Sequence, residues 1–253
     1  FMTDVIGGEQ QSAWPGARPR TRMGAALDAF GSRLWRPACP AAPLCVLAAT
    51  WVVLVNNRRL FGSLDERLDL ASVSGLACFL AIFLGFIGMV ATGLLLIGHK
   101  YVLKPAVISL LILSAVLGYF TNEWGVVFDM KMIRNIVETF ADNNRQEAME
   151  VITPPLALRV LLLAVLPSLA VLATKVKWRC ARRELLERSL YAGGMLLLFA
   201  LLVLPNYRYA LFFARENVRL KYYATPMHAL NSLRKYAFDA LRRDRPFVVI
   251  GQD

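Results

Sequence analysis

The chain has 253 residues, is 57% hydrophobic, and carries 29 Lys and Arg against 18 Asp and Glu, a net charge of +11. The apolar share exceeds that of ordinary soluble domains and is concentrated in long runs, which favours a polytopic membrane protein over a soluble one. The basic residues flank these runs, so they indicate orientation and contact with anionic lipid headgroups, and no nucleic-acid partner is expected.

The cysteine and histidine content argues against a metal or redox site. Cys39, Cys45, Cys78 and Cys180 lie in or beside apolar runs without zinc-finger or redox spacing, so they are expected to pack as small side chains. There are only two histidines, which excludes a His-rich metal site. We therefore expect neither a metal ion nor another cofactor in this chain.

Residues 1–36 are rich in Gly, Pro and Arg and show no periodicity, which predicts a disordered cytoplasmic tail. Phe1 precedes Met2, and Met23 opens a more protein-like segment. Both methionines are candidate starts, and part of 1–22 is a candidate start-site artefact. A cleaved signal peptide is not expected, because no small-residue cleavage site follows the first apolar run.

Five long apolar runs follow, and they predict an all-α membrane protein with five transmembrane helices within residues 37–206. The predicted spans lie near 38–57, 71–98, 106–120, 156–174 and 189–206. The third is short for a bilayer that takes about 20 helical residues to cross, so its ends should extend into the flanking segments. Thr153-Pro154 predicts the start of the fourth helix, with proline at its first position.

The distribution of basic residues predicts the orientation of the spans. Lys and Arg gather in the N-terminal tail, the 99–105 turn and the 175–188 segment, whereas acidic residues balance them in the 58–69 and 121–155 loops. The N-terminus is therefore predicted inside, with the 121–155 loop and the C-terminus outside. The basic segment 207–253 departs from the charge rule, which segments beyond the last span follow less strictly.

Residues 207–253 are predicted to hold an amphipathic helix on the outer membrane surface. Thr225-Pro226 indicates its start. The apolar residues after it recur at helical spacing, and basic residues occupy the other faces; the apolar set is Met227, Leu230, Leu233, Ala237 and Leu241. A solvated linker is the alternative.

The 121–155 loop is predicted to contain a second amphipathic helix, over residues 130–142. At about 100° per residue, one arc is apolar and the opposite arc is polar; the polar arc holds Asn135, Glu138, Thr139 and Asp142. Asn143-Asn144 should end this helix. The polar arc could be a solvated surface, or it could bind a zwitterionic lipid headgroup, with a carboxylate at the ammonium and amide and hydroxyl groups at phosphate oxygens.

Several motifs in this region resemble one family. Tyr101-Val102-Leu103-Lys104-Pro105, Tyr119-Phe120-Thr121, Gly125-Val126-Val127-Phe128-Asp129 and Met132-Ile133-Arg134-Asn135 occur in that order. Together they are similar to the lipid A phosphoethanolamine transferases, which include the mobile colistin-resistance enzymes. The resemblance covers residues 40–253, up to the closing Pro246-Phe247-Val248-Val249-Ile250 run.

The resemblance implies a five-helix inner-membrane domain, a bridging helix on its periplasmic side, and a zinc-dependent periplasmic domain of the alkaline-phosphatase type. Such an enzyme moves phosphoethanolamine from phosphatidylethanolamine to lipid A through a threonine nucleophile. Family residues that contact the donor headgroup match Asn135 and Thr139 at identical spacing. A third, a glutamate, matches Glu147 if four residues are inserted within 140–146. Trp124 and Thr225 stand where the family usually has tyrosine and asparagine.

The family's Gly-Glu-Thr nucleophile motif does not occur in the chain. We therefore expect a membrane domain without catalytic residues, inactive alone, whose zinc-binding catalytic domain would follow Asp253. Alternatives are the membrane domain of a phosphoglycerol or lipoteichoic-acid synthase and, from another class, a small transporter, whose site would need ionisable residues within the spans.

Overall fold

The computed structural model describes residues 38–141 and 153–243. The predicted tail, residues 1–36, lies outside this part. Four helical segments are long and apolar enough to cross a membrane: α4 (Val73–Ile97), α5 (Leu103–Glu123), the segment Pro154–Ala173, and α10 (Ala181–Val203). A fifth span is formed if the bent pair α2 (Ala41–Asn56) and α3 (Arg58–Asp65) counts as one, with 67° between its two parts. The predicted all-α membrane fold is confirmed.

The boundaries of two spans differ from the sequence prediction in informative ways. The short third run does extend at both ends, because α5 is 21 residues long. The last span begins eight residues before the predicted 189, at Ala181. Arg188 explains this early start, since its guanidinium donates to the backbone oxygens of Leu95, at 2.7 Å, and Gly98 at the end of α4. A cation is favourable at a helix C-terminus, and helix α10 places it there.

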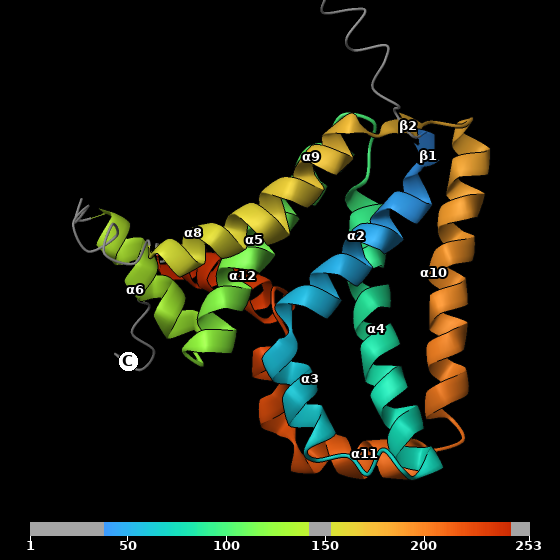
Figure 1. The fold of residues 1–253 in the computed structure, drawn as a ribbon, viewed down its shortest axis with the longest axis vertical. Helices are drawn as coiled ribbons and strands as arrows, with labels where there is room; N and C mark the ends of the chain where they lie inside the picture. Colours follow the sequence, from blue (N-terminus) through green and yellow to red (C-terminus); the bar gives the residue numbers. More distant parts are fainter. Residues whose placement is uncertain (1–37, 142–152, 244–253) are drawn as a thin grey trace, which may run out of the picture. The chain divides into compact units, whose positions relative to one another are not determined.

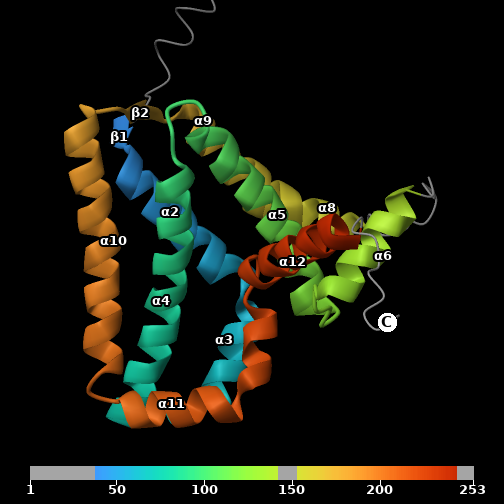
Figure 2. The same cartoon turned by 180° about the vertical axis from the view of Figure 1, so that it is seen from behind.

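The segment Pro154–Ala173 consists of α8 (Pro154–Val160), a π-helical turn η1 (Leu161–Val165) and α9 (Leu166–Ala173). It runs alongside α5 in both views (Figures 1 and 2). Helix α2 packs on both α4 and α5, and α10 packs mainly on α4. One buried apolar cluster joins α2, α5 and α9, and a second joins α2, α3 and α4 with the C-terminal segment.

One pair of strands was not predicted. The short strand β1 (Ala38–Pro40) pairs in parallel with β2 (Lys175–Lys177), so that Ala38 lies opposite Lys175. The two strands hydrogen-bond backbone N–H and C=O groups of each other just outside the ends of α2 and α9, where the helices offer these groups no partner. The start of α2 and the turn after α9 therefore lie at the same end of the helices, as the charge pattern predicts.

The C-terminal segment holds three helices within the described residues, where the sequence predicts a single surface helix. They are α11 (Tyr207–Glu216), the 3-10 helix η2 (Val218–Tyr223) and α12 (Met227–Arg243). Helix α12 begins directly after Thr225-Pro226, where the sequence predicts a helix start. Figure 2 shows α11 crossing near the ends of α3 and α4, and α12 lying beside α6 (Met130–Ala141).

Candidate lipid-binding site

The turn between α5 and α6 sets the position of the predicted headgroup helix. After α5, the backbone N–H of Val126 donates to Phe120 O at 3.1 Å, and the Thr121 hydroxyl donates to Val126 O at 3.1 Å. Gly125 has φ 67°, and a Cβ there would lie 2.6 Å from Nη1 of Arg59. Only glycine suits both the left-handed backbone and this close guanidinium.

Helix α6 is fixed at its start and along one face. Asp129 caps it, because its Oδ1 accepts the N–H of Met132 at 2.8 Å. A small apolar cluster then holds α6 against the end of α5 and the first turn of α12; it contains Leu117, Phe120, Val126, Phe128, Met132, Ile136 and Ala229. The α6 residues in this cluster are Met132 and Ile136, whereas Val137, on the predicted apolar arc of the helix, is 40% exposed. The packed side of α6 therefore matches the predicted apolar arc only in part.

Two of the polar residues predicted to bind a headgroup, Asn135 and Thr139, lie on α6 next to the packed residues Met132 and Ile136. Asn135 is exposed and Thr139 is half-buried, and being four positions apart they stack on one face. Neither makes a side-chain hydrogen bond to any residue in the two described ranges. Glu138 is also exposed beside them. Glu147 and Asp142 lie outside the described residues, so the predicted grouping of Glu147 with Asn135 and Thr139 stays a prediction.

A second polar feature, which the sequence analysis missed, lies where α5 meets α8. A cavity of about 640 Å³ is lined there by Tyr119, Glu123, Trp124, Pro155, Leu158, Arg159, Leu162 and Leu163. Arg159 Nη1 lies 3.2 Å from Glu123 Oε1, and the Arg159 side chain is only 17% exposed. The hydroxyls of Tyr119 and Thr153 lie 3.2 Å apart. The cavity thus combines a carboxylate, a guanidinium and aromatic rings.

Two signals in the sequence could have identified this cavity. Arg159 falls inside a run that otherwise reads as a membrane span, where an ionisable residue usually has a partner and a function. Glu123 falls within the predicted 121–155 loop, but it is the last residue of α5. The ring of Trp124, 58% exposed, lies 5.4 Å from that of Phe120, which in turn lies 6.3 Å from Phe128. The aromatic contacts join this cavity to the base of α6.

A buried polar cluster ties α12 to the bend between α2 and α3. Asn57 is 1% exposed and Thr225 is 2% exposed. The Thr225 N–H donates to Asn57 Oδ1 at 2.8 Å, and Asn57 Nδ2 donates to Thr225 O at 2.9 Å. Asn56 extends the cluster, since its Nδ2 donates to Ser114 Oγ on α5 at 3.1 Å and its backbone oxygen accepts from Asn122 at 3.1 Å.

His228, in the first turn of α12, is half-buried between these features. Burial lowers its pKa below 6.5, and Lys235 and Lys221 act in the same direction, whereas Asp129 opposes the shift. Its ring meets that of Tyr222 edge to face, with centroids 5.0 Å apart. His228 Nε2 is buried and has no hydrogen-bond partner among the described residues, which fits a neutral imidazole.

The described residues include no cluster of three or more His, Cys, Asp or Glu side chains that could hold a metal ion. The residues present therefore do not fit the zinc that the family resemblance implies, and no chemical step is assigned to zinc on this part of the chain.

Comparison with known proteins gives consistent matches. A family model described as phosphoethanolamine transferase EptA/EptB matches residues 86–241. The phosphatidylethanolamine transferases Mcr-1 and Mcr-2 of Escherichia coli are 30% identical over 195 residues and 33% identical over 143 residues. These alignments cover 77% and 56% of this chain but only 35% and 26% of the relatives. The chain thus spans about a third of the length of Mcr-1.

A solved structure shares the fold. The integral membrane protein lipooligosaccharide phosphoethanolamine transferase A (EptA) of Neisseria meningitidis superposes with a TM-score of 0.74 at 23% identity. The match covers 84% of this chain and 39% of that protein. At this identity the likeness establishes the arrangement of the helices and nothing finer.

Proposed function

This chain belongs to the EptA/EptB family of phosphoethanolamine transferases, and from that membership we propose that it is the membrane domain of an enzyme that transfers phosphoethanolamine from phosphatidylethanolamine to lipid A. In the proposed enzyme the chain anchors a periplasmic catalytic domain and binds the donor lipid. Adding an ammonium group to lipid A lowers its negative charge, so cationic peptides and polymyxins would bind the modified membrane less well.

The proposal of a donor-lipid site rests mainly on the polar side chains of α6. Met132 and Ile136 hold this helix against α5 and α12, and the amide of Asn135 and the hydroxyl of Thr139 make no hydrogen bond to the described residues. Asn135 and Thr139 would bind phosphate and ester oxygens of the donor. Glu147 would hold the ammonium, because the residues after α6 could fold back over the same face.

The cavity between α5 and α8 supports the same chemistry. Glu123 and the exposed ring of Trp124 can attract an ammonium, while Arg159 can pair with a phosphate oxygen. Glu123 and Trp124 lie at the C-terminal end of α5, and α6 is the next helix in the chain. A phosphoethanolamine headgroup carries both charges, so a carboxylate beside a guanidinium matches it better than a surface of one sign.

We further propose that the chain lies in the bacterial inner membrane with its N-terminus in the cytoplasm and its C-terminus in the periplasm. The basic 99–105 and 175–188 segments support this orientation. The parallel pairing of β1 with β2 adds support, because it places two segments predicted to be cytoplasmic at one end of the helices. Helix α6 and the C-terminal helices would then face the periplasm, where the catalytic domain of such an enzyme works.

The test is retention of phosphatidylethanolamine by the purified chain, measured by native mass spectrometry in detergent. Asn135→Ala and Glu147→Gln should each weaken retention, the latter by about ten- to a hundredfold, which corresponds to a charged hydrogen bond of about 1.5–3 kcal/mol. Asn231→Ala is the matched control, since Asn231 is an exposed amide on α12. Unchanged retention in both variants would refute the headgroup site. A loss only in Glu138→Gln would keep the site and show that the insertion was aligned wrongly.

A further inference from the structure

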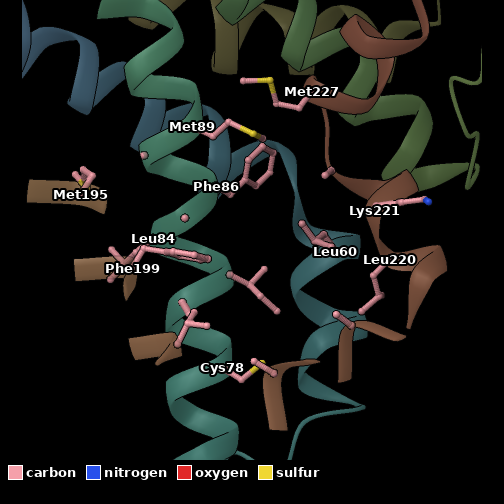
Figure 3. A pocket seen from close by; sticks show the side chains of 18 of the residues that line it. Leu60, Cys78, Leu84, Phe86, Met89, Met195, Phe199, Leu220, Lys221 and Met227 are labelled. Atoms are coloured by element: carbon pink, nitrogen blue, oxygen red, sulfur yellow. The ribbon is translucent and has the colours of Figure 1, made fainter. Parts of the chain in front are cut away.

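A large apolar cavity lies on a different part of the molecule from α6. It has a volume of about 1400 Å³, is open on one side, and is lined mainly by residues of α3, α4, α10, α11 and η2. Figure 3 shows side chains of these elements around it, among them Leu60, Phe86 and Leu220. The lining is apolar apart from Thr92, Tyr207, Asn217 and Lys221. Pockets for drug-sized ligands usually measure about 300–1,000 Å³, so this one suits a larger apolar molecule.

The glycines of α4 that line the cavity differ in what lies beside them. A Cβ on Gly85 would lie 2.8 Å from the Phe199 ring, and one on Gly88 would lie 3.2 Å from Met195 Cβ. Helices α4 and α10 are in close contact there. At Gly93, which also lines the cavity, a Cβ would meet no atom within 4 Å. The space beside Gly93 can therefore be filled by a side chain without a clash.

The rim of the cavity is cationic. The aliphatic stem of Lys221 lines the cavity, and Figure 3 shows its nitrogen pointing outward. Arg67 reaches the same rim, because its Nη1 donates to Oδ1 of the lining residue Asn217 at 2.7 Å. No carboxylate lines the cavity, and within the described ranges none lies within salt-bridge distance of Lys221 or Arg67, although Glu216 is next to Asn217 in the chain.

We propose that this cavity binds the acyl chains of an anionic, phosphate-bearing lipid, with Lys221 and Arg67 at its phosphate. The apolar wall matches acyl chains, and the volume leaves room for more than one. The cations match a phosphate, whereas a zwitterionic headgroup would leave its ammonium without a carboxylate. This goes beyond the donor site on α6: it is a second lipid site, with the chemistry of a phosphorylated acceptor.

The experiment measures lipid binding to the purified chain by native mass spectrometry, with bis-phosphorylated lipid A, phosphatidylglycerol and phosphatidylethanolamine as probes. Gly93→Leu fills the cavity and should lower affinity for both anionic lipids by at least about tenfold. Gly194→Leu is its control, because Gly194 lies on α10, outside the lining, and a Cβ there also meets nothing within 4 Å. Lys221→Gln should reduce the preference for anionic lipids, while Lys235→Gln, on exposed α12, should leave it unchanged.

Four results would overturn the proposal. Gly93→Leu could bind the anionic lipids as well as the wild type does. Alternatively, Gly194→Leu could lose as much affinity for the anionic lipids as Gly93→Leu does. The Asn135→Ala variant, whose donor site is weakened, could also retain phosphatidylethanolamine as strongly as the anionic lipids. A dimer that dissociates in Gly93→Leu, without any bound lipid, would assign the cavity to a second copy instead. Failure of the donor site is distinguished by Asn135→Ala, which should affect phosphatidylethanolamine and leave the anionic lipids bound.

Discussion

Replacing Asn57 with alanine tests whether a single side chain holds the C-terminal segment to the first span. Asn57 Oδ1 accepts the Thr225 N–H at 2.8 Å, and its Nδ2 donates to Thr225 O at 2.9 Å. Both residues are almost fully buried. Asn57→Ala therefore leaves one buried N–H and one buried carbonyl of Thr225 without these partners.

The magnitude follows from the cost of an unsatisfied buried group, about 1–3 kcal/mol. Two such groups give a loss of about 2–4 kcal/mol, since water entering the space left by the side chain would recover part of it. Thr225→Val should cost less, about 0.5–1.5 kcal/mol, because it removes only the hydroxyl contacts at 3.1 and 3.4 Å and keeps both backbone bonds.

The assay is thermal unfolding of the purified chain in detergent, together with the rate of tryptic cleavage within α12. Asn57→Ala should unfold at a clearly lower temperature than Thr225→Val and expose α12 to trypsin. Asn231→Ala, on the exposed side of α12, should behave as the wild type. Equal destabilisation by Asn57→Ala and Thr225→Val would refute the reasoning, because the backbone bonds would then contribute nothing.

Two further predictions concern orientation and pH. In a cysteine-free background, cysteines at Gly62 and Asn231 should react with an impermeant thiol reagent in intact spheroplasts and one at Arg182 should not; the reverse pattern would invert the orientation. Lowering the pH below 6.5 should destabilise the chain until the lower folded-state pKa of His228 is reached, because the unfolded imidazole binds its proton first. His228→Gln should remove this pH dependence of the unfolding temperature, whereas His99→Gln, in an exposed turn, should retain it.

The features that could be predicted from the sequence depend on local periodicity. Apolar runs of membrane length predicted the spans, and the 3.6-residue pattern predicted α6 within one residue of its observed bounds at Met130 and Ala141. Helix α3 lies within the predicted 58–69 loop and follows the same rule, because Leu60 and Leu64 are four apart and both are buried. Two leucines beside a pair of arginines are too short a pattern to distinguish a helix from a loop.

Helix α11 and the large cavity could not be predicted in this way. Tyr207–Glu216 is amphipathic but only ten residues long and follows directly on the last span, so its short pattern does not separate it from the end of that span. The cavity is lined by residues of α3, α4, α10, α11 and η2, so it depends on how elements far apart in the chain pack around one space. A glycine in an apolar run is common in membrane helices, and only the packed pair of α4 and α10 shows which glycines make contact and which leave space.

The candidate headgroup site illustrates the same division between local pattern and packing. Periodicity alone places Asn135 and Thr139 on one face of α6, but it does not place that face in space. Its position depends on Ala229 of α12 packing in the cluster with α6, and α12 is held in turn by Thr225 on Asn57. These contacts join positions 168 residues apart in the chain. A pattern read over one helical turn carries no information about such a pair, so the residues of the site are visible in the sequence while the residues that position them are not.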